Sequence, residues 1–134
     1  MLFTENLTDI IYYRHEHIAQ TDELIILSGY VGPKPIAKLG EIPLRSTVIY
    51  GMYGAESINP TLHNSLLNLQ KKNESLSIFY STLPVHSKCY IWKNNGQIVH
   101  ALVGSANFSV NGLNTPQREI LAETTRDTFM PLNN

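Results

Sequence analysis

Hydrophobic and polar positions along the chain predict short strands alternating with helices. Apolar runs of strand length are separated by stretches in which apolar residues recur at the three-to-four spacing of an amphipathic helix. The strand-like runs are residues 23–28, 46–50 and 76–80. The helical patterns are residues 6–20, 35–39 and 61–72. From residue 23 onward the elements therefore follow the order βαβαβ, which is typical of an α/β fold.

The second half of the chain predicts a hairpin. Residues 86–92 alternate in polarity, residues 97–103 form a second apolar run, and Asn95-Gly96 lies between them. Asn-Gly between two such runs is a strong signal for a tight hairpin turn. If residues 86–92 form a strand, His86 and Lys88 project from the same face. The hairpin then brings the start of the first run beside the end of the second, and a last strand is expected over 117–123.

The predicted fold class is α/β, with a mixed β-sheet flanked by helices on both faces in a single domain, residues 1–134. Binding sites of open α/β sheets lie beyond the carboxyl ends of the strands. Gly29, Gly51 and Gly104 each follow or end a predicted strand there. Each glycine either lets the backbone approach a ligand closely or simply makes a turn.

Length and charge limit the functional classes. The 134 residues, 43% of them hydrophobic, suffice for one domain with its own core. The formal net charge of −1 provides no overall basic field for nucleic acid. Binding of DNA would therefore need local cations or a further domain. The scattered arginines also predict that this chain alone reads no particular base sequence.

The sequence predicts a cytoplasmic protein. The only cysteine, Cys89, excludes an internal disulfide and a cysteine-rich zinc site, and its apolar neighbours predict a buried thiol. The amino-terminal residues lack the basic and apolar regions of a signal peptide. No apolar run reaches the roughly 20 residues that cross a bilayer, so no membrane association is expected.

Side chains suited to phosphate chemistry gather in the predicted hairpin and just after it. An imidazole such as His86 can act as nucleophile or proton donor near neutral pH. Lys88 supplies a cation for phosphate oxygens, and Ser105 and Asn107 can add neutral donors. Glu119 can hold the second imidazole nitrogen and fix the tautomer, as carboxylates do in hydrolase triads.

These residues resemble the motif of the phospholipase D superfamily, which is His-x-Lys followed downstream by Gly-Ser-x-Asn. The matching residues are His86, Lys88, Gly104, Ser105 and Asn107. Lys93 stands where the family usually carries an aspartate. The branch of NgoFVII-type restriction endonucleases also lacks that aspartate and has a glutamate about a dozen residues after the asparagine, a spacing that Glu119 fits.

The resemblance implies a reaction and a set of roles. His86 attacks phosphorus and forms a phosphohistidine, a second histidine protonates the leaving group, and water resolves the intermediate. The implied catalytic residues are His86, Lys88, Asn107 and Glu119, and the implied phosphate-binding residues are Ser105 and Gly104. The reaction requires no metal and no cofactor. The implied fold is the phospholipase D-like sandwich.

The implied function is cleavage of DNA, as the catalytic domain of a Type II restriction endonuclease. The same motif also serves phospholipid phosphodiesterases and transferases, which would be expected to carry an exposed amphipathic or aromatic element for the lipid surface. A degenerate domain that binds DNA without cleaving it is the third reading. Small size, a single motif copy and the glutamate spacing favour the nuclease.

One His-x-Lys motif supplies one of the two histidines that the mechanism needs. A two-fold symmetric homodimer with one shared active site would bring both copies together. The family domain usually continues further, so this chain is expected to be a short variant or the N-terminal fragment of a longer protein.

The other histidines have plainer interpretations. His100, within an apolar run, is expected to be a satisfied core histidine, and His63 a surface residue. His15 and His17 are not expected to bind a metal, because residues two apart on a helix face different ways. Tyr90 and Trp92 either wall the site or pack in the core.

Overall fold

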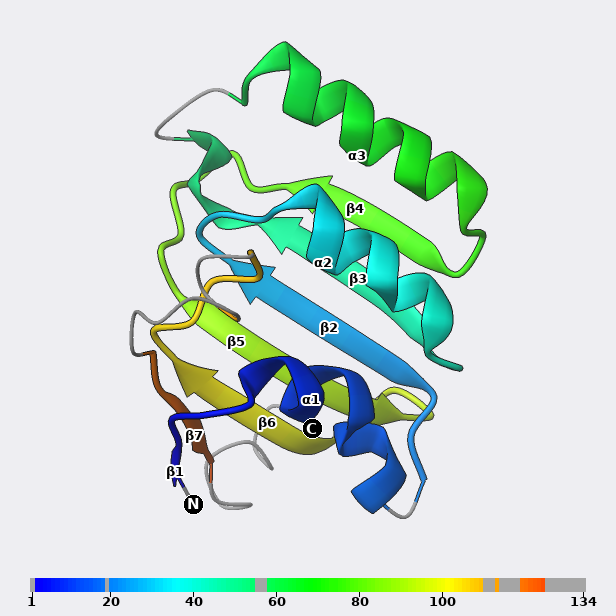
Figure 1. Ribbon diagram of the computed structural model, residues 1–134, viewed down its shortest axis with the longest axis vertical. Coiled ribbons are helices and arrows are strands. Elements are labelled where there is room, and N and C mark those ends of the chain that lie inside the picture. The colour runs from blue at the N-terminus through cyan, green and yellow to red at the C-terminus, as the bar shows by residue number, and fades with distance from the viewer. Residues whose placement is uncertain (1, 19, 55–57, 110–112, 114–118, 125–134) are drawn as a thin grey trace.

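A computed structural model describes residues 2–18, 20–54, 58–109, 113 and 119–124 (Figure 1). Within these residues, seven strands form one mixed sheet in the order β1-β7-β6-β5-β2-β3-β4. The strands are β1 (Leu2–Phe3), β2 (Glu23–Ser28), β3 (Arg45–Tyr50), β4 (Leu76–Tyr80), β5 (Lys88–Asn94), β6 (Gln97–Gly104) and β7 (Leu121–Glu123). The helices are α1 (Leu7–Tyr13), α2 (Pro33–Lys38) and α3 (Pro60–Lys72), with 3-10 turns η1 (Arg14–His17), η2 (Leu39–Glu41) and η3 (Gly51–Gly54).

The parallel part of the sheet has the predicted βαβαβ order. β2 pairs in parallel with β3, and β3 pairs in parallel with β4, while α2 and α3 make the two crossovers. Pro60 occupies the first turn of α3, where its missing N–H has no helical partner to lose, and Asn59 caps the Leu62 N–H at 3.0 Å. The predicted boundaries of these strands and of α3 hold to within one residue.

The predicted hairpin joins β5 to β6. Asn95 and Gly96 both have positive φ, 51° and 80°, as a tight turn with right-handed strand twist requires. One expectation differs from the structure: β5 begins at Lys88, so His86 lies in the preceding loop rather than on a strand face. The register places Lys88 opposite Gly104, which brings the two halves of the motif together as expected.

The core lies on one face of the sheet. Inward side chains of every second strand residue, such as Leu24, Ile26 and Trp92, are fully buried together with Ile11 and Ile36 of the helices. Figure 1 shows α1 and α2 in front of the sheet, and α3 packs beside α2 and against β4. The α/β class with a mixed sheet is therefore confirmed. Among the described residues, the helices that the prediction placed on both faces pack against this one face.

Strand alternation settles two side-chain expectations on β5. Tyr90 and Trp92 point inward and are fully buried, so they belong to the core and do not wall a site. Cys89 lies between Lys88 and Tyr90 and projects from the opposite face, where it is half-buried. The expectation of a buried core thiol is therefore wrong. No helix in the described ranges is long and apolar enough to span a membrane.

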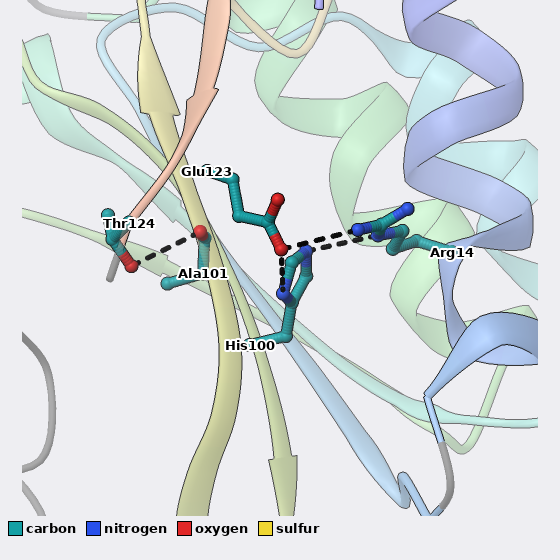
Figure 2. A network of polar contacts seen from close by, with 5 residues as sticks. All are labelled: Arg14, His100, Ala101, Glu123 and Thr124. Atoms are coloured by element: carbon teal, nitrogen blue, oxygen red, sulfur yellow. Dashed lines mark hydrogen bonds and ion pairs between the residues drawn. The ribbon is translucent and has the colours of Figure 1, made fainter. Parts of the chain in front are cut away.

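A polar network holds the short strand β7 against the helical layer. Figure 2 shows His100 between Arg14 and Glu123: Arg14 Nε donates to His100 Nε2 at 3.1 Å, and His100 Nδ1 lies 3.5 Å from Glu123 Oε1. Arg14 Nη2 also reaches Glu123 Oε1 at 3.4 Å. Because Arg14 only donates, the Nε2 of His100 is unprotonated and the ring is neutral. His100 is buried and satisfied, as predicted.

This network predicts that acid destabilises the fold. Burial, and then the Arg14 guanidinium, lowers the pKa of His100, while Glu123 raises it by a smaller amount. The folded state therefore binds fewer protons than the unfolded chain once the pH falls below about 6.5. The stability contributed by neutral His100 is present above that pH and is lost as the pH falls through the folded pKa. The slope from this residue is at most about 1.4 kcal/mol per pH unit.

Thermal unfolding between pH 7.5 and pH 5 measures the effect. The unfolding temperature of the wild type should fall more steeply than that of His100→Gln, whose amide can accept from Arg14 and donate to Glu123 without titrating. His17→Gln serves as the matched control, because His17 is exposed on η1. Parallel curves for the wild type and His100→Gln would show that His100 is not the titrating group.

Candidate active site

The sheet topology gathers the motif residues at one edge. β5 runs antiparallel to β2, and β6 runs antiparallel to β5, so β6 points in the same direction as β2, β3 and β4. The carboxyl ends of these strands and the amino end of β5 therefore lie at the same edge. Lys88 begins β5 there and His86 lies in the loop just before it, while Gly29 follows β2 and Asn107 follows β6.

His86 and Lys88 form the centre of the site. Lys88 Nζ lies 2.7 Å from Nδ1 and 3.0 Å from Nε2 of His86, so the ammonium contacts both ring nitrogens. Lys88 is 7% exposed, whereas His86 is exposed. Burial lowers the pKa of Lys88, and the Glu119 carboxylate opposes this with a smaller raising effect. An ammonium only donates, so the ring nitrogen that accepts from Lys88 carries no proton.

Two glycines let the backbone approach His86 closely. A Cβ on Gly29 would lie 3.3 Å from His86 Cδ2 and 3.5 Å from Asn107 Oδ1, so the glycine separates these two side chains. A Cβ on Gly51 would lie 2.1 Å from the Val85 carbonyl oxygen, which real structures do not tolerate. Val85 N donates to Gly51 O at 2.8 Å and thereby sets the loop that carries His86. Both glycines are therefore more than plain turn residues.

The amide of Asn107 has one defined orientation. Its Oδ1 accepts from the Tyr30 backbone N–H at 3.2 Å and lies 3.1 Å from Ser28 Oγ. A backbone N–H can only donate, so the oxygen must be the atom on that side and Nδ2 points the other way. No described residue accepts a hydrogen bond from Nδ2. The two N–H bonds of Asn107 are therefore available to a phosphate oxygen.

Ser28 holds Asn107 and the loop after β6 in place, a role that the sequence did not predict. The fully buried hydroxyl accepts from the Phe108 N–H at 3.0 Å and joins the loop after β2 to the loop after β6. The signal available in the sequence was a small polar residue that closes an otherwise apolar strand. Such a residue supports a site without touching the ligand.

Gly104 and Ser105 have structural partners in the segment before β7. A Cβ on Gly104 would lie 1.9 Å from the Ile120 carbonyl oxygen, so only glycine allows that approach. Ser105 N donates to Ile120 O at 2.9 Å, and Ile120 N donates to Ser105 Oγ at 3.0 Å. These contacts tie residues 119–121 to the site edge. Phosphate binding by Gly104 and Ser105 stays a prediction beside this packing role.

Comparison with known proteins identifies the family of this chain. Residues 5–134 match the family described as "NgoFVII restriction endonuclease N-terminal PLD domain", where PLD denotes phospholipase D. The chain belongs to this family. It is a phospholipase D-like nuclease or phosphodiesterase domain of the restriction endonuclease type, as the motif predicted. No curated protein has a detectably similar sequence.

Solved structures show the same fold. NucT from Helicobacter pylori superposes with a TM-score of 0.65 at 16% identity, over 98% of this chain and 89% of that one. Yeast tyrosyl-DNA phosphodiesterase superposes with a TM-score of 0.52 at 15% identity, over 93% of this chain and 31% of that one. The phospholipase D-like architecture is therefore confirmed.

Glu119 lies two residues before β7, close enough to Lys88 to act on its charge. Its carboxylate acts on the charge of Lys88, and no hydrogen bond between Glu119 and His86 occurs among the described residues. In this phospholipase D-like domain, the Glu119 carboxylate favours the charged form of Lys88 and so opposes part of the effect of burial on the Lys88 pKa. Its predicted role in orienting an imidazole stays a prediction.

All five histidines of the chain lie in the described ranges. Of these, His86 is the one that contacts the Lys88 ammonium. His63 is half-buried at the surface, and its Nδ1 contacts the Tyr80 hydroxyl at 2.6 Å. Within the described ranges, no three His, Cys, Asp or Glu side chains are grouped so that they could hold a metal ion.

Proposed function

We propose that this phospholipase D-like domain cleaves phosphodiester bonds of DNA without a metal ion, with His86 as nucleophile. The observation that carries the proposal is the contact between Lys88 Nζ and the His86 imidazole, 2.7 Å from Nδ1, at the edge where the strands end. The exposed ring can meet a large substrate, while the buried lysine is held in position beside it.

The proposed reaction has two steps. In the first, an unprotonated ring nitrogen of His86 forms a bond to phosphorus as the bond from phosphorus to the leaving oxygen breaks, and an acid gives that oxygen a proton. In the second, water attacks the phosphohistidine, the P–N bond breaks, and the same acid, now a base, takes the proton of the water. The imidazole of His86 is then restored.

Positioned donors stabilise the charge that develops on the phosphoryl oxygens. Lys88 provides a full positive charge, and its burial makes that charge more effective than it would be in water. The Nδ2 of Asn107 provides a donor whose direction is set by Tyr30 and Ser28. Ser105 and Gly104 are proposed to add donors on the same side.

The acid of the first step is proposed to be the partner's His86 in a homodimer with a shared active site. This phospholipase D-like domain carries one His-x-Lys motif, and the reaction needs histidines on opposite sides of phosphorus. A two-fold interface would bring the same edge of each subunit together. The protein is proposed to act as the catalytic domain of a Type II restriction endonuclease. Residues other than those of the active site are proposed to recognise the base sequence.

Metal independence provides the direct test of this chemistry. Nicking of plasmid DNA should proceed at the same rate in excess EDTA and in EDTA followed by excess Mg²⁺, because His86 and Lys88 supply the nucleophile and the charge. Phosphatidylcholine vesicles should not be hydrolysed under the same conditions. Loss of nicking in EDTA with recovery in Mg²⁺ would contradict the proposed mechanism, and faster cleavage of the lipid would contradict the proposed substrate.

A further inference from the structure

A row of aromatic rings leads away from His86 along the edge of the sheet. Tyr30 follows β2 and meets His86 edge-on, with ring centroids 6.3 Å apart. Tyr50 ends β3 at 6.2 Å from Tyr30, and Tyr80 ends β4 at 6.0 Å from Tyr50. Tyr53 of η3 then stacks on Tyr80 at 5.0 Å with an interplanar angle of 16°. We call these four tyrosines the tyrosine track.

The tyrosine track lies at the margin of the core, since Tyr50 belongs to the core and Tyr30, Tyr53 and Tyr80 pack against it. Core rings such as Tyr90 and Phe108 are fully buried, whereas Tyr30, Tyr53 and Tyr80 are only half-buried. Each of the four side chains also carries a polar hydroxyl, which suits a surface in contact with water. The track is therefore a partly accessible aromatic surface that starts at the nucleophile.

The rings of the tyrosine track are held in place. His63 Nδ1 contacts the Tyr80 hydroxyl at 2.6 Å, and the Tyr80 ring is in turn flanked by Tyr50 and Tyr53. Burial, followed by its tyrosine neighbours, raises the pKa of Tyr80, so the phenol is neutral at physiological pH. Because these rings are already ordered, the tyrosine side chains lose little conformational entropy when a ligand stacks on them.

The chemistry of the track points to unpaired bases. The track carries no cationic side chain, and the chain has a net charge of −1, so attraction of the phosphate backbone cannot be its main contribution. Aromatic side chains bind bases by stacking, and this requires a base whose face is not covered by its neighbours in a duplex. From β5 to β4 the row crosses three strand spacings, or about 14 Å, which accommodates a few nucleotides.

We infer that the tyrosine track binds a single-stranded segment of the DNA substrate, by base stacking, beside the phosphate that His86 attacks. The inference rests on the proposed function, since it places the scissile phosphate at His86 and Lys88. It adds that the strand leaves the site toward β4 and is unpaired where it crosses Tyr30 and Tyr53, so that a duplex such as a plasmid has to open locally there before it is cleaved. Affinity should therefore depend on the bases more than on the number of phosphates.

A pair of oligonucleotides tests the inference. Binding of a fluorescent oligothymidylate of about ten nucleotides is compared with binding of an abasic strand of the same length and charge, in the His86→Ala background to prevent turnover. The oligothymidylate should bind about tenfold more tightly or better, as stacking of one or more bases predicts. It should also bind more tightly than a duplex of the same sequence. Equal affinity for the abasic strand would overturn the inference without any variant of the track.

Two leucine variants locate the stacking surface. Tyr53→Leu should remove most of the preference for the oligothymidylate over the abasic strand, whereas Tyr80→Phe, which keeps the ring, should retain it. Phe79→Leu is the matched control, because Phe79 is 56% exposed and projects from β4 on the face opposite to Tyr80. An equal loss of preference in Phe79→Leu and Tyr53→Leu would show that the effect does not come from the track.

Hydrolysis of bis(4-nitrophenyl) phosphate separates this inference from the proposed function. This small diester has no bases and tests only whether the domain cleaves a phosphodiester. If the wild type does not cleave it, the proposed reaction fails, yet the preference for bases over an abasic strand still decides whether the track binds DNA. If the diester is cleaved and the preference is absent, the reaction stands and the track is rejected.

Discussion

Replacement of His86 by alanine is expected to reduce phosphodiester cleavage by about a thousandfold or more while the fold is retained. Loss of a nucleophile or of a main charge-stabilising group costs enzymes several powers of ten in rate. His86 is exposed in the loop before β5, so its removal leaves no cavity in the core. Lys88→Met should cause a loss of similar size, because it keeps the buried aliphatic stem and removes only the charge.

Hydrolysis of bis(4-nitrophenyl) phosphate and thermal unfolding together measure this expectation. His17→Ala is the matched control, since His17 is an exposed histidine on η1. It should keep wild-type rates, and all three variants should unfold at similar temperatures. Glu119→Gln should lose less activity than Lys88→Met, because Glu119 acts on Lys88 rather than on phosphate. Turnover near the wild-type level in His86→Ala would remove His86 from the mechanism.

The second large effect is expected in mixed dimers. A heterodimer of one wild-type subunit and one His86→Ala subunit should be essentially inactive, because a shared site needs both histidines for one turnover. If each subunit held a complete site of its own, the heterodimer would keep about half of the wild-type rate. The measured loss therefore distinguishes a shared site from two independent ones without knowledge of the interface.

Two affinity tags on the two subunit types allow the heterodimer to be purified before its rate is measured. A heterodimer of wild-type and His17→Ala subunits, prepared in the same way, should keep the full rate and controls for subunit exchange. Sedimentation of the wild type at the assay concentration completes the experiment. A heterodimer with half of the wild-type rate would contradict the shared active site. Full activity of a wild-type protein that sediments as a monomer would contradict it as well.

Local signals were enough to predict the element order and the hairpin. A tight hairpin turn at Asn95-Gly96 requires positive φ at both residues, and the structure has φ of 51° and 80° there. The same pattern placed His86 on a strand, whereas β5 starts only at Lys88. The difference arises because residues 84–87 leave the sheet to follow Gly51, whose carbonyl accepts from Val85 N. That contact joins residues far apart in the chain and has no local signature.

The role of Asn107 was likewise only partly predictable. The motif marked the residue, but its orientation depends on Tyr30 and Ser28, which lie near the end of β2 and approach Asn107 only in the folded sheet. The alignment of the four tyrosines in one track had no sequence signal either. Its rings come from the ends of β2, β3 and β4 and from η3, and only the parallel register aligns them in one row.

The sequence by itself determined the α/β order, the hairpin and the occurrence of His86 and Lys88 in one motif, because strand period, turn conformation and motif spacing are properties of neighbouring residues. The tertiary structure decided which groups meet. In the folded chain, Tyr90 and Trp92 are buried in the core and His63 contacts Tyr80. Only glycine fits at positions 51 and 104, because the backbones of Val85 and Ile120 approach too closely for a Cβ. Those outcomes depend on distances between strands that are remote in sequence, and a local pattern contains no information on such distances.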